Sequence, residues 1–97
     1  MAARTPLTPA QIDDALAGLP GWTYEDDRLK KSFVFDDFRT AVGFIVRLAF
    51  CAEALDHHPD LHNVYNRVDL ALNTHDAGGR VTERDLALAR AIEDLNG

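Results

Sequence analysis

The sequence predicts an α+β fold, an antiparallel sheet with helices packed on one of its faces. The first observation behind this prediction is the order of periodic segments along the chain: helix, strand, strand, helix, strand, helix. The second is the length of 97 residues, for which we expect residues 1–97 to form a single domain. The third is an apolar content of 46% with one cysteine, so the core must form without a disulfide framework.

The first quarter of the chain predicts a helix followed by a hairpin. Residues 8–11 read Thr-Pro-Ala-Gln, which combines a hydroxyl cap, proline at the first helical position and an amide three residues after the cap. The glycines in residues 18–21 should end this helix. Residues 22–25 and 29–35 then have the composition of strands, and residues 26–27 are expected to form the turn between them.

A second, longer helix is expected from a cap at Asp36 or Asp37 to about Leu55. The residues at helical spacing that should face the core are Phe38, Val42, Ile45, Ala49, Ala52 and Leu55. Further apolar residues occupy the other sides of this helix. A helix that is apolar over so much of its circumference predicts a surface shared with a second copy of the chain.

The second half of the chain predicts a loop, a strand and a final helix. Pro59 disfavours continuation of the long helix, so residues 57–62 are expected to form a turn or loop. A further short strand near this loop is also compatible with the sequence. Residues 64–72 alternate between apolar and polar over most of their length, which predicts one long strand. A turn at residues 76–79 should lead to a last helix that opens at residues 82–85.

The overall charge argues against two classes of partner. The net charge is −6 and no basic stripe is present, so neither nucleic acid nor an anionic membrane is the expected partner. The longest apolar stretch, residues 42–55, is interrupted by charged residues and is too short to span a bilayer. Residues 1–6 lack the apolar region of a secretory signal, so we expect a soluble, cytoplasmic protein.

The histidines carry the strongest functional signal. His57, His58 and His62 fall within six residues, and the fourth histidine, His75, ends the strand that follows. Imidazole gains and loses protons near neutral pH, which suits acid-base catalysis or metal binding. Glu53 precedes His57 by four residues and would neighbour it if the last helical turn persists. Asp85, in the first turn of the last helix, is expected at the same end of the sheet as His75, and Tyr65 completes the candidate cluster.

These residues also have simpler and competing interpretations. Asp85 is also the third residue of a capping box begun by Thr82, and loop histidines are often only exposed to solvent. His58 and His62 have the spacing of a helical metal pair, but Pro59 lies between them. Neither an H-E-x-x-H pattern nor paired cysteines occur. The sequence therefore favours proton transfer over a metal site.

Four short motifs, taken together, are specific. They are Glu53-Ala-Leu-Asp-His-His-Pro59, Asn63-Val-Tyr65, Thr74-His75 and Thr82-Glu-Arg-Asp85. In order and nearly in spacing they closely resemble the pterin-4a-carbinolamine dehydratase family, whose members are also known as dimerisation cofactors of a homeodomain transcription factor. The resemblance extends over almost the whole chain.

This resemblance implies a four-stranded antiparallel sheet with helices on one face, and a homodimer or homotetramer. It implies the loss of water from 4a-hydroxytetrahydropterin to give quinonoid dihydropterin. That reaction recycles the pterin of aromatic amino acid hydroxylases, and it uses no metal and no cofactor, because the pterin is the substrate. A non-catalytic protein-binding or assembly module on the same fold is the alternative.

The resemblance also assigns roles by position. His57 and His75 would be the acid-base pair, and His58 would contact the pterin ring. The supporting or substrate-binding positions would be Glu53, Asp56, Pro59, Tyr65 and Asp85. The physical chemistry agrees, because a hydroxyl leaves poorly unless it is protonated, and a positioned imidazole typically contributes ~10²- to 10⁴-fold.

Overall fold

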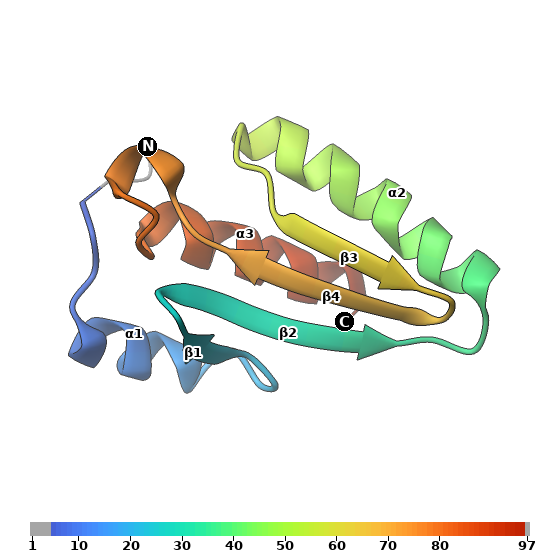
Figure 1. The fold of residues 1–97 in the computed structure, drawn as a ribbon, viewed down its shortest axis with the longest axis horizontal. Coiled ribbons are helices and arrows are strands. Elements are labelled where there is room, and N and C mark those ends of the chain that lie inside the picture. The colour runs from blue at the N-terminus through green and yellow to red at the C-terminus, as the bar shows by residue number, and fades with distance from the viewer. Residues whose placement is uncertain (1–4, 97) are drawn as a thin grey trace.

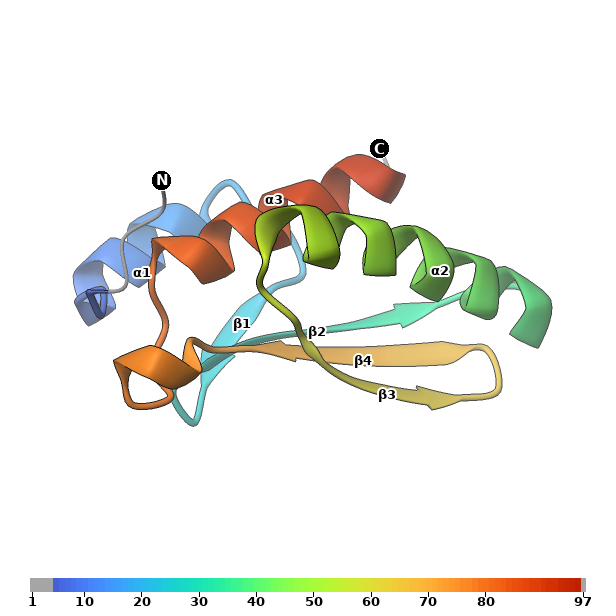
Figure 2. The ribbon, with the colours of Figure 1, turned by 90° about the horizontal axis from the view of Figure 1, so that it is seen from above.

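The computed structural model describes residues 5–96 as a four-stranded antiparallel sheet with helices on one side. The elements are α1 (Pro9–Leu16), β1 (Thr23–Glu25), β2 (Arg28–Val34), α2 (Phe38–Leu55), β3 (Asp60–Val64), β4 (Arg67–Leu72), the 3-10 turn η1 (His75–Ala77) and α3 (Glu83–Asn96). The strand order is β1-β2-β4-β3, and every neighbouring pair is antiparallel (Figure 1). Figure 2 shows the three helices on the same side of the sheet. The predicted α+β class is confirmed.

Local sequence rules account for the first helix and the first hairpin. The Thr8 hydroxyl accepts the Gln11 N–H, and the Gln11 side chain accepts the Thr8 N–H in return. Asp26 and Asp27 both have positive φ, 53° and 60°, as a two-residue hairpin turn requires. The predicted cap and turn are therefore confirmed.

The cap of α2 makes a testable contribution to stability. The Asp37 carboxylate accepts hydrogen bonds from the Thr40 hydroxyl at 2.7 Å and from the Thr40 N–H at 2.8 Å. These bonds, the hydroxyl first, hold the pKa of Asp37 below its usual value of 3.8. A lowered folded-state pKa stabilises the protein above the unfolded value, and this stabilisation is lost as the pH falls through the folded pKa.

Asp37→Asn keeps a side-chain oxygen at the cap but removes the charge. We therefore expect the free energy of unfolding of the wild type to fall more steeply than that of Asp37→Asn between pH ~5 and ~2. Denaturant unfolding of both proteins across this range measures the difference. Parallel pH profiles for the two proteins would contradict the assigned role of the carboxylate.

The buried face of α2 differs from the predicted one. Its buried residues are Ala41, Phe44, Leu48 and Ala52. Of the six predicted core positions only Ala52 is buried, while Phe38 is 51% and Leu55 40% exposed. The prediction was wrong because apolar residues surround most of this helix, so periodicity did not identify which stripe meets the sheet and α3.

The strand predicted at residues 64–72 is shorter than expected, because only residues 67–72 form one strand and residues 60–72 together form a hairpin. β3 ends at Val64, the chain turns at Tyr65 and Asn66, and β4 begins at Arg67. Tyr65 adopts a positive φ of 50°, and the Asn63 side chain donates to the Tyr65 and Arg67 carbonyls. His62 lies within β3, so the prediction of a loop through residue 62 was also wrong.

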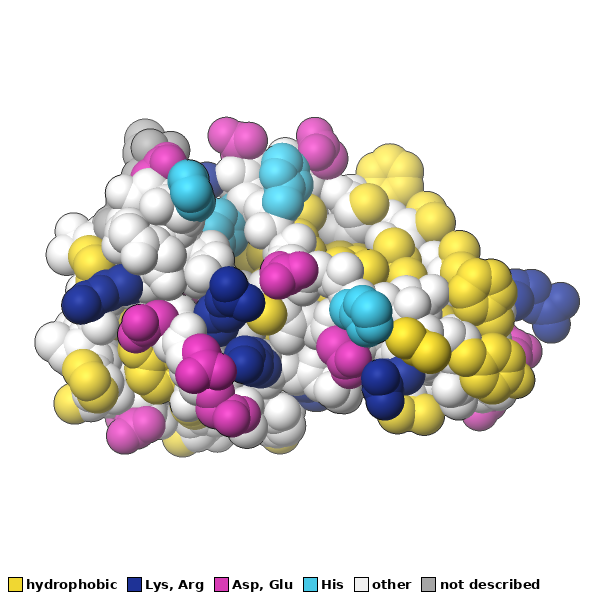
Figure 3. All heavy atoms as spheres, viewed as in Figure 1, with side chains coloured by type: hydrophobic (Ala, Val, Ile, Leu, Met, Phe, Trp, Pro, Cys, Tyr) yellow, Lys and Arg dark blue, Asp and Glu magenta, His cyan; other side chains and the backbone are white. Residues whose placement is uncertain are grey.

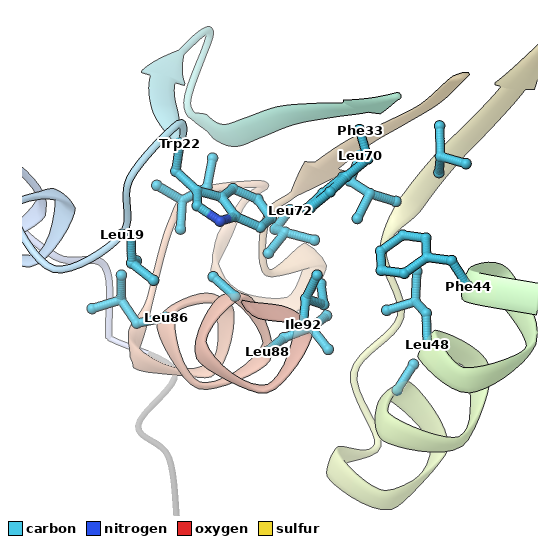
Figure 4. Close-up of a cluster of buried hydrophobic side chains, with 14 of the residues drawn as sticks. Leu19, Trp22, Phe33, Phe44, Leu48, Leu70, Leu72, Leu86, Leu88 and Ile92 are labelled. Atoms are coloured by element: carbon cyan, nitrogen blue, oxygen red, sulfur yellow. The ribbon is translucent and has the colours of Figure 1, made fainter. Parts of the chain in front are cut away.

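The core fills the space between the sheet and the helices. Val68, Leu70 and Leu72 alternate inward along β4 and meet side chains of α2 and α3, as Figure 4 shows for Phe44, Leu48, Leu88 and Ile92. This packing leaves the opposite face of the sheet open and polar. No helix within residues 5–96 combines the length and apolarity needed to cross a membrane.

Candidate active site

The end of α2 turns His57 into the protein. Asp56 caps the helix in the left-handed conformation, with φ 49° and ψ 44°, so the chain reverses there. The His57 N–H then donates to the Ala52 carbonyl at 3.0 Å, and the residue is only 8% exposed. A backbone reversal thus converts a helix-end histidine into a buried one.

Asp85 lies against this imidazole from the first turn of α3. The residue is fully buried, and its Oδ1 lies 2.5 Å from His57 Nε2. Its Oδ2 accepts the Thr74 hydroxyl and the Thr82 N–H, each at 2.9 Å. A carboxylate only accepts hydrogen bonds, so His57 Nε2 is assigned the proton. The other ring nitrogen, Nδ1, is then left with a lone pair for proton transfer.

His58 faces solvent rather than the core. Its Nε2 lies 2.9 Å from Glu53 Oε1, and both side chains are well exposed. The spacing had predicted that Glu53 pairs with His57. It pairs with His58 instead, because α2 ends before residue 57. His58, Glu53 and Pro59 line a small hollow of about 210 Å³, whose remaining wall is apolar.

His75 reaches the same end of the molecule from the other side. It opens η1, separated from the end of β4 by two residues, and is exposed. Its neighbour Thr74 is hydrogen-bonded to Asp85, which in turn holds His57. Figure 3 shows histidine side chains gathered over η1 and the connection between α2 and β3. The structure thus brings the segments carrying His57, His58 and His75 together at one end of the sheet.

Two predicted supporting residues are placed differently. Tyr65 lies at the turn between β3 and β4, 64% exposed, whereas the histidines gather at the other end of this hairpin. Five residues of β3 separate the two ends by roughly 16 Å, so the structure does not bring Tyr65 into the histidine cluster. Asp56 contributes through its carbonyl, which accepts from the Arg84 guanidinium, while its side chain is exposed.

Thr74 and Arg84 were missed from the sequence. Thr74 had a detectable signal, because it continues the inward alternation of Val68, Leu70 and Leu72 and is 1% exposed. A threonine at such a position implies a buried hydroxyl that needs a partner. Arg84 had no such signal, since its contact with Asp56 spans 28 residues.

The residues available for a metal ion are few. Within residues 5–96 no group of three or more histidine, cysteine, aspartate or glutamate side chains is arranged to hold a metal. The arrangement that is present, a buried imidazole–carboxylate pair beside two exposed imidazoles, suits proton transfer.

The fold and this cluster define an α+β protein with a histidine-rich site at one end of an antiparallel sheet. Residues 5–95 match the family described as Pterin 4 alpha carbinolamine dehydratase. The chain belongs to that family, and membership supports a dehydratase function.

Individual relatives agree with this assignment. A protein from Opitutus terrae is 52% identical over 92 residues, which cover 95% of both chains, and one from Rhizorhabdus wittichii is 52% identical with 93% and 94% covered. Both carry the name pterin-4-alpha-carbinolamine dehydratase as an unproven assignment. A crystal structure from Brucella melitensis, described as a transcriptional coactivator/pterin dehydratase, is 43% identical with a TM-score of 0.90, and 96% of this chain and 100% of that one are covered.

A more distant structure shares the fold alone. It is a pterin dehydratase-like protein described as a RuBisCO assembly factor in the alpha-carboxysome. It is 23% identical, with a TM-score of 0.63 over 78% of this chain and 87% of that one.

Proposed function

We propose that this protein dehydrates 4a-hydroxytetrahydropterin to quinonoid dihydropterin, with His57 and His75 as the acid-base pair. The observation that carries the proposal is the buried His57–Asp85 pair beside the turn that bears His75. Family membership supports the dehydratase class, and the site supports the choice of residues.

The reaction needs proton transfer at two places on one flat substrate. The C4a hydroxyl must receive a proton to leave as water, and a second proton must leave a ring nitrogen. In the proposal one imidazole serves each place, so no metal and no cofactor beyond the substrate is needed. His58, oriented by Glu53, contacts the pterin ring, and Pro59 borders that contact. Asp56 supports the imidazoles through the reversed backbone rather than through its carboxylate.

The test is a coupled assay. A turning-over aromatic amino acid hydroxylase supplies 4a-hydroxytetrahydropterin, and the quinonoid product is followed by absorbance. Wild-type protein should exceed the spontaneous rate, and His57→Ala combined with His75→Ala should not. A wild-type rate equal to the spontaneous one would refute the proposal. Dehydratase that is treated with a chelator and freed of it before the assay should keep its rate, and a loss of activity after this treatment would refute the metal-free mechanism.

The link to a hydroxylase is part of the same proposal. The carbinolamine is a reactive intermediate, so the dehydratase is expected in the compartment where the hydroxylase releases it, the cytoplasm. Imaging of the tagged protein tests this placement.

A homodimer or homotetramer is also proposed, on the basis of one exposed apolar surface. Figure 3 shows hydrophobic side chains gathered over α2 and the adjacent turn of the β3–β4 hairpin. The exposed residues of this surface are Val34, Phe38, Val46, Phe50, Val64 and Tyr65. Contiguous exposed apolar side chains of this kind usually mark an interaction site.

Phe50→Glu is expected to reduce the oligomer to a smaller species, because Phe50 is 75% exposed in the single chain and its burial would be lost. Sedimentation velocity of both proteins at equal concentration measures the change. Ala17→Glu, which adds the same charge to an exposed residue just after α1, is the control. An unchanged sedimentation coefficient for Phe50→Glu would contradict the proposed interface.

The same surface favours the second candidate function, a non-catalytic protein-binding or assembly module. Pterin binding without turnover in the coupled assay would support this module. Turnover that depends on His57 and His75 would remove it.

A further inference from the structure

We propose that Thr74 is a positioning residue that couples the two imidazoles of the acid-base pair. This inference rests on the proposed function, because it concerns how that same site is held together. Thr74 lies between β4 and η1 and is 1% exposed. Its backbone holds the turn that carries His75, and its hydroxyl holds Asp85, the partner of His57.

The backbone of Thr74 fixes the turn that carries His75. Its N–H donates to the Arg80 carbonyl at 2.8 Å. Its carbonyl accepts the N–H groups of Ala77 at 3.0 Å and Gly79 at 3.1 Å. The ends of the turn are therefore fastened to the single residue that precedes His75.

The hydroxyl of Thr74 has its direction set by its neighbours. It lies 2.9 Å from Asp85 Oδ2 and 2.7 Å from Thr82 Oγ1. A carboxylate can only accept, so the Thr74 proton goes to Asp85, and the Thr82 hydroxyl must donate to Thr74. Thr82 Oγ1 in turn accepts the Arg84 N–H at 3.2 Å. One directed chain of hydrogen bonds thus runs from the start of α3 to Asp85.

This chain ends at His57, because the other oxygen of Asp85 lies 2.5 Å from His57 Nε2. Removal of the Thr74 hydroxyl would take one donor from the carboxylate and leave the buried Thr82 hydroxyl without its acceptor. The carboxylate and the imidazole it orients would then lose a fixed position relative to the turn that bears His75. A misplacement of ~1 Å in such a site can cost on the order of 100-fold in rate.

Two substitutions separate positioning from packing. Thr74→Val keeps the branched shape and removes the hydroxyl, whereas Thr74→Ser keeps the hydroxyl and removes a methyl group. Thr40→Val is a matched control, because it removes an exposed threonine–aspartate hydrogen bond at the far end of α2. The readouts are kcat and KM in the coupled assay and the downfield proton NMR signal of the short His57–Asp85 hydrogen bond.

We expect Thr74→Val to lower kcat by roughly 10- to 100-fold with little change in KM. We also expect it to weaken the downfield signal or speed its exchange with solvent. Thr74→Ser and Thr40→Val should resemble the wild type in both respects. An unchanged signal in Thr74→Val, or equal losses in Thr74→Val and Thr74→Ser, would overturn the positioning role.

The NMR readout keeps this test separate from the proposed function, because it needs no turnover. If Thr74→Val does not fold, Thr82→Val takes its place, since it removes the hydroxyl that donates to Thr74 but keeps the backbone bond to Asp85. A smaller change of the His57 signal in the same direction is then expected. No change in that variant would overturn the inference.

Discussion

Asp85→Asn is expected to lower kcat by roughly 10²- to 10⁴-fold, which is the contribution of a correctly protonated base. In the wild type the carboxylate accepts from Thr74, Thr82 and His57. An asparagine side chain has only one accepting oxygen, and the Thr74 hydroxyl and the Thr82 N–H would both donate to it. The amide NH₂ would then face His57.

The consequence falls on the tautomer of His57. Opposite an amide donor, Nε2 must accept, so the ring proton moves to Nδ1 and the lone pair proposed for proton transfer is lost. The coupled assay measures kcat and KM of Asp85→Asn, and a thermal unfolding curve verifies that the variant is folded. Asp13→Asn, at an exposed position in α1, is the control. A folded Asp85→Asn with wild-type kcat would contradict the role of the pair.

His75→Gln is expected to lower kcat over the same range, ~10²- to 10⁴-fold, because it removes the second proton-transfer group. His75 is exposed at the first position of η1. Its replacement should therefore change the free energy of unfolding by no more than ~0.5 kcal/mol. The comparison of kcat with a urea unfolding curve separates the two effects.

The chain contains its own control for His75. His62 is also exposed, but it lies on β3 opposite Asp69 and outside the cluster. His62→Gln should leave kcat unchanged. Equal kcat values for His75→Gln and His62→Gln would show that His75 takes no part in the reaction.

The double substitution of His57 and His75 should lower kcat by less than the product of the two single effects, because the effects of groups that act together are not additive.

Short-range features of the fold were predictable from the sequence. The Thr8 cap, the Asp37 cap and the Asp26–Asp27 turn are each decided by a few adjacent residues, and the structure confirms them. Periodicity also predicted the order of the three helices and of three of the four strands, but it did not separate β3 from β4.

Features that depend on tertiary packing were not predictable in this way. The buried stripe of α2 is chosen by contact with the sheet and α3, and several stripes of this helix are apolar. The turn at Tyr65 and Asn66 was overlooked because Val64 stays in phase with the apolar residues of β4, although Asn66 interrupts the alternation between them. The positive φ of 50° at Tyr65 and the antiparallel pairing of β3 with β4 reveal the hairpin.

For the candidate site, the sequence predicted which segments come together better than which side chains pair. The motifs that carry His57, His58 and His75 do lie at one end of the sheet, whereas Tyr65 does not. The i, i+4 spacing predicted that Glu53 pairs with His57. Because the left-handed Asp56 ends the helix before residue 57, Glu53 pairs with His58 instead. The partner of His57 is Asp85, 28 residues away, and no local rule reports such a contact.

The central claim is that three of the histidines form one pterin site, and the most direct test is to locate where a pterin binds. The four histidines can be followed by NMR in ¹⁵N-histidine-labelled protein during titration with a dihydropterin that cannot react. We expect the imidazole signals of His57, His58 and His75 to shift together with one saturation curve, while the signal of His62 does not shift. A bound pterin that shifts only the signal of His62, or leaves those of His57 and His75 unchanged, would contradict a shared site of the three histidines.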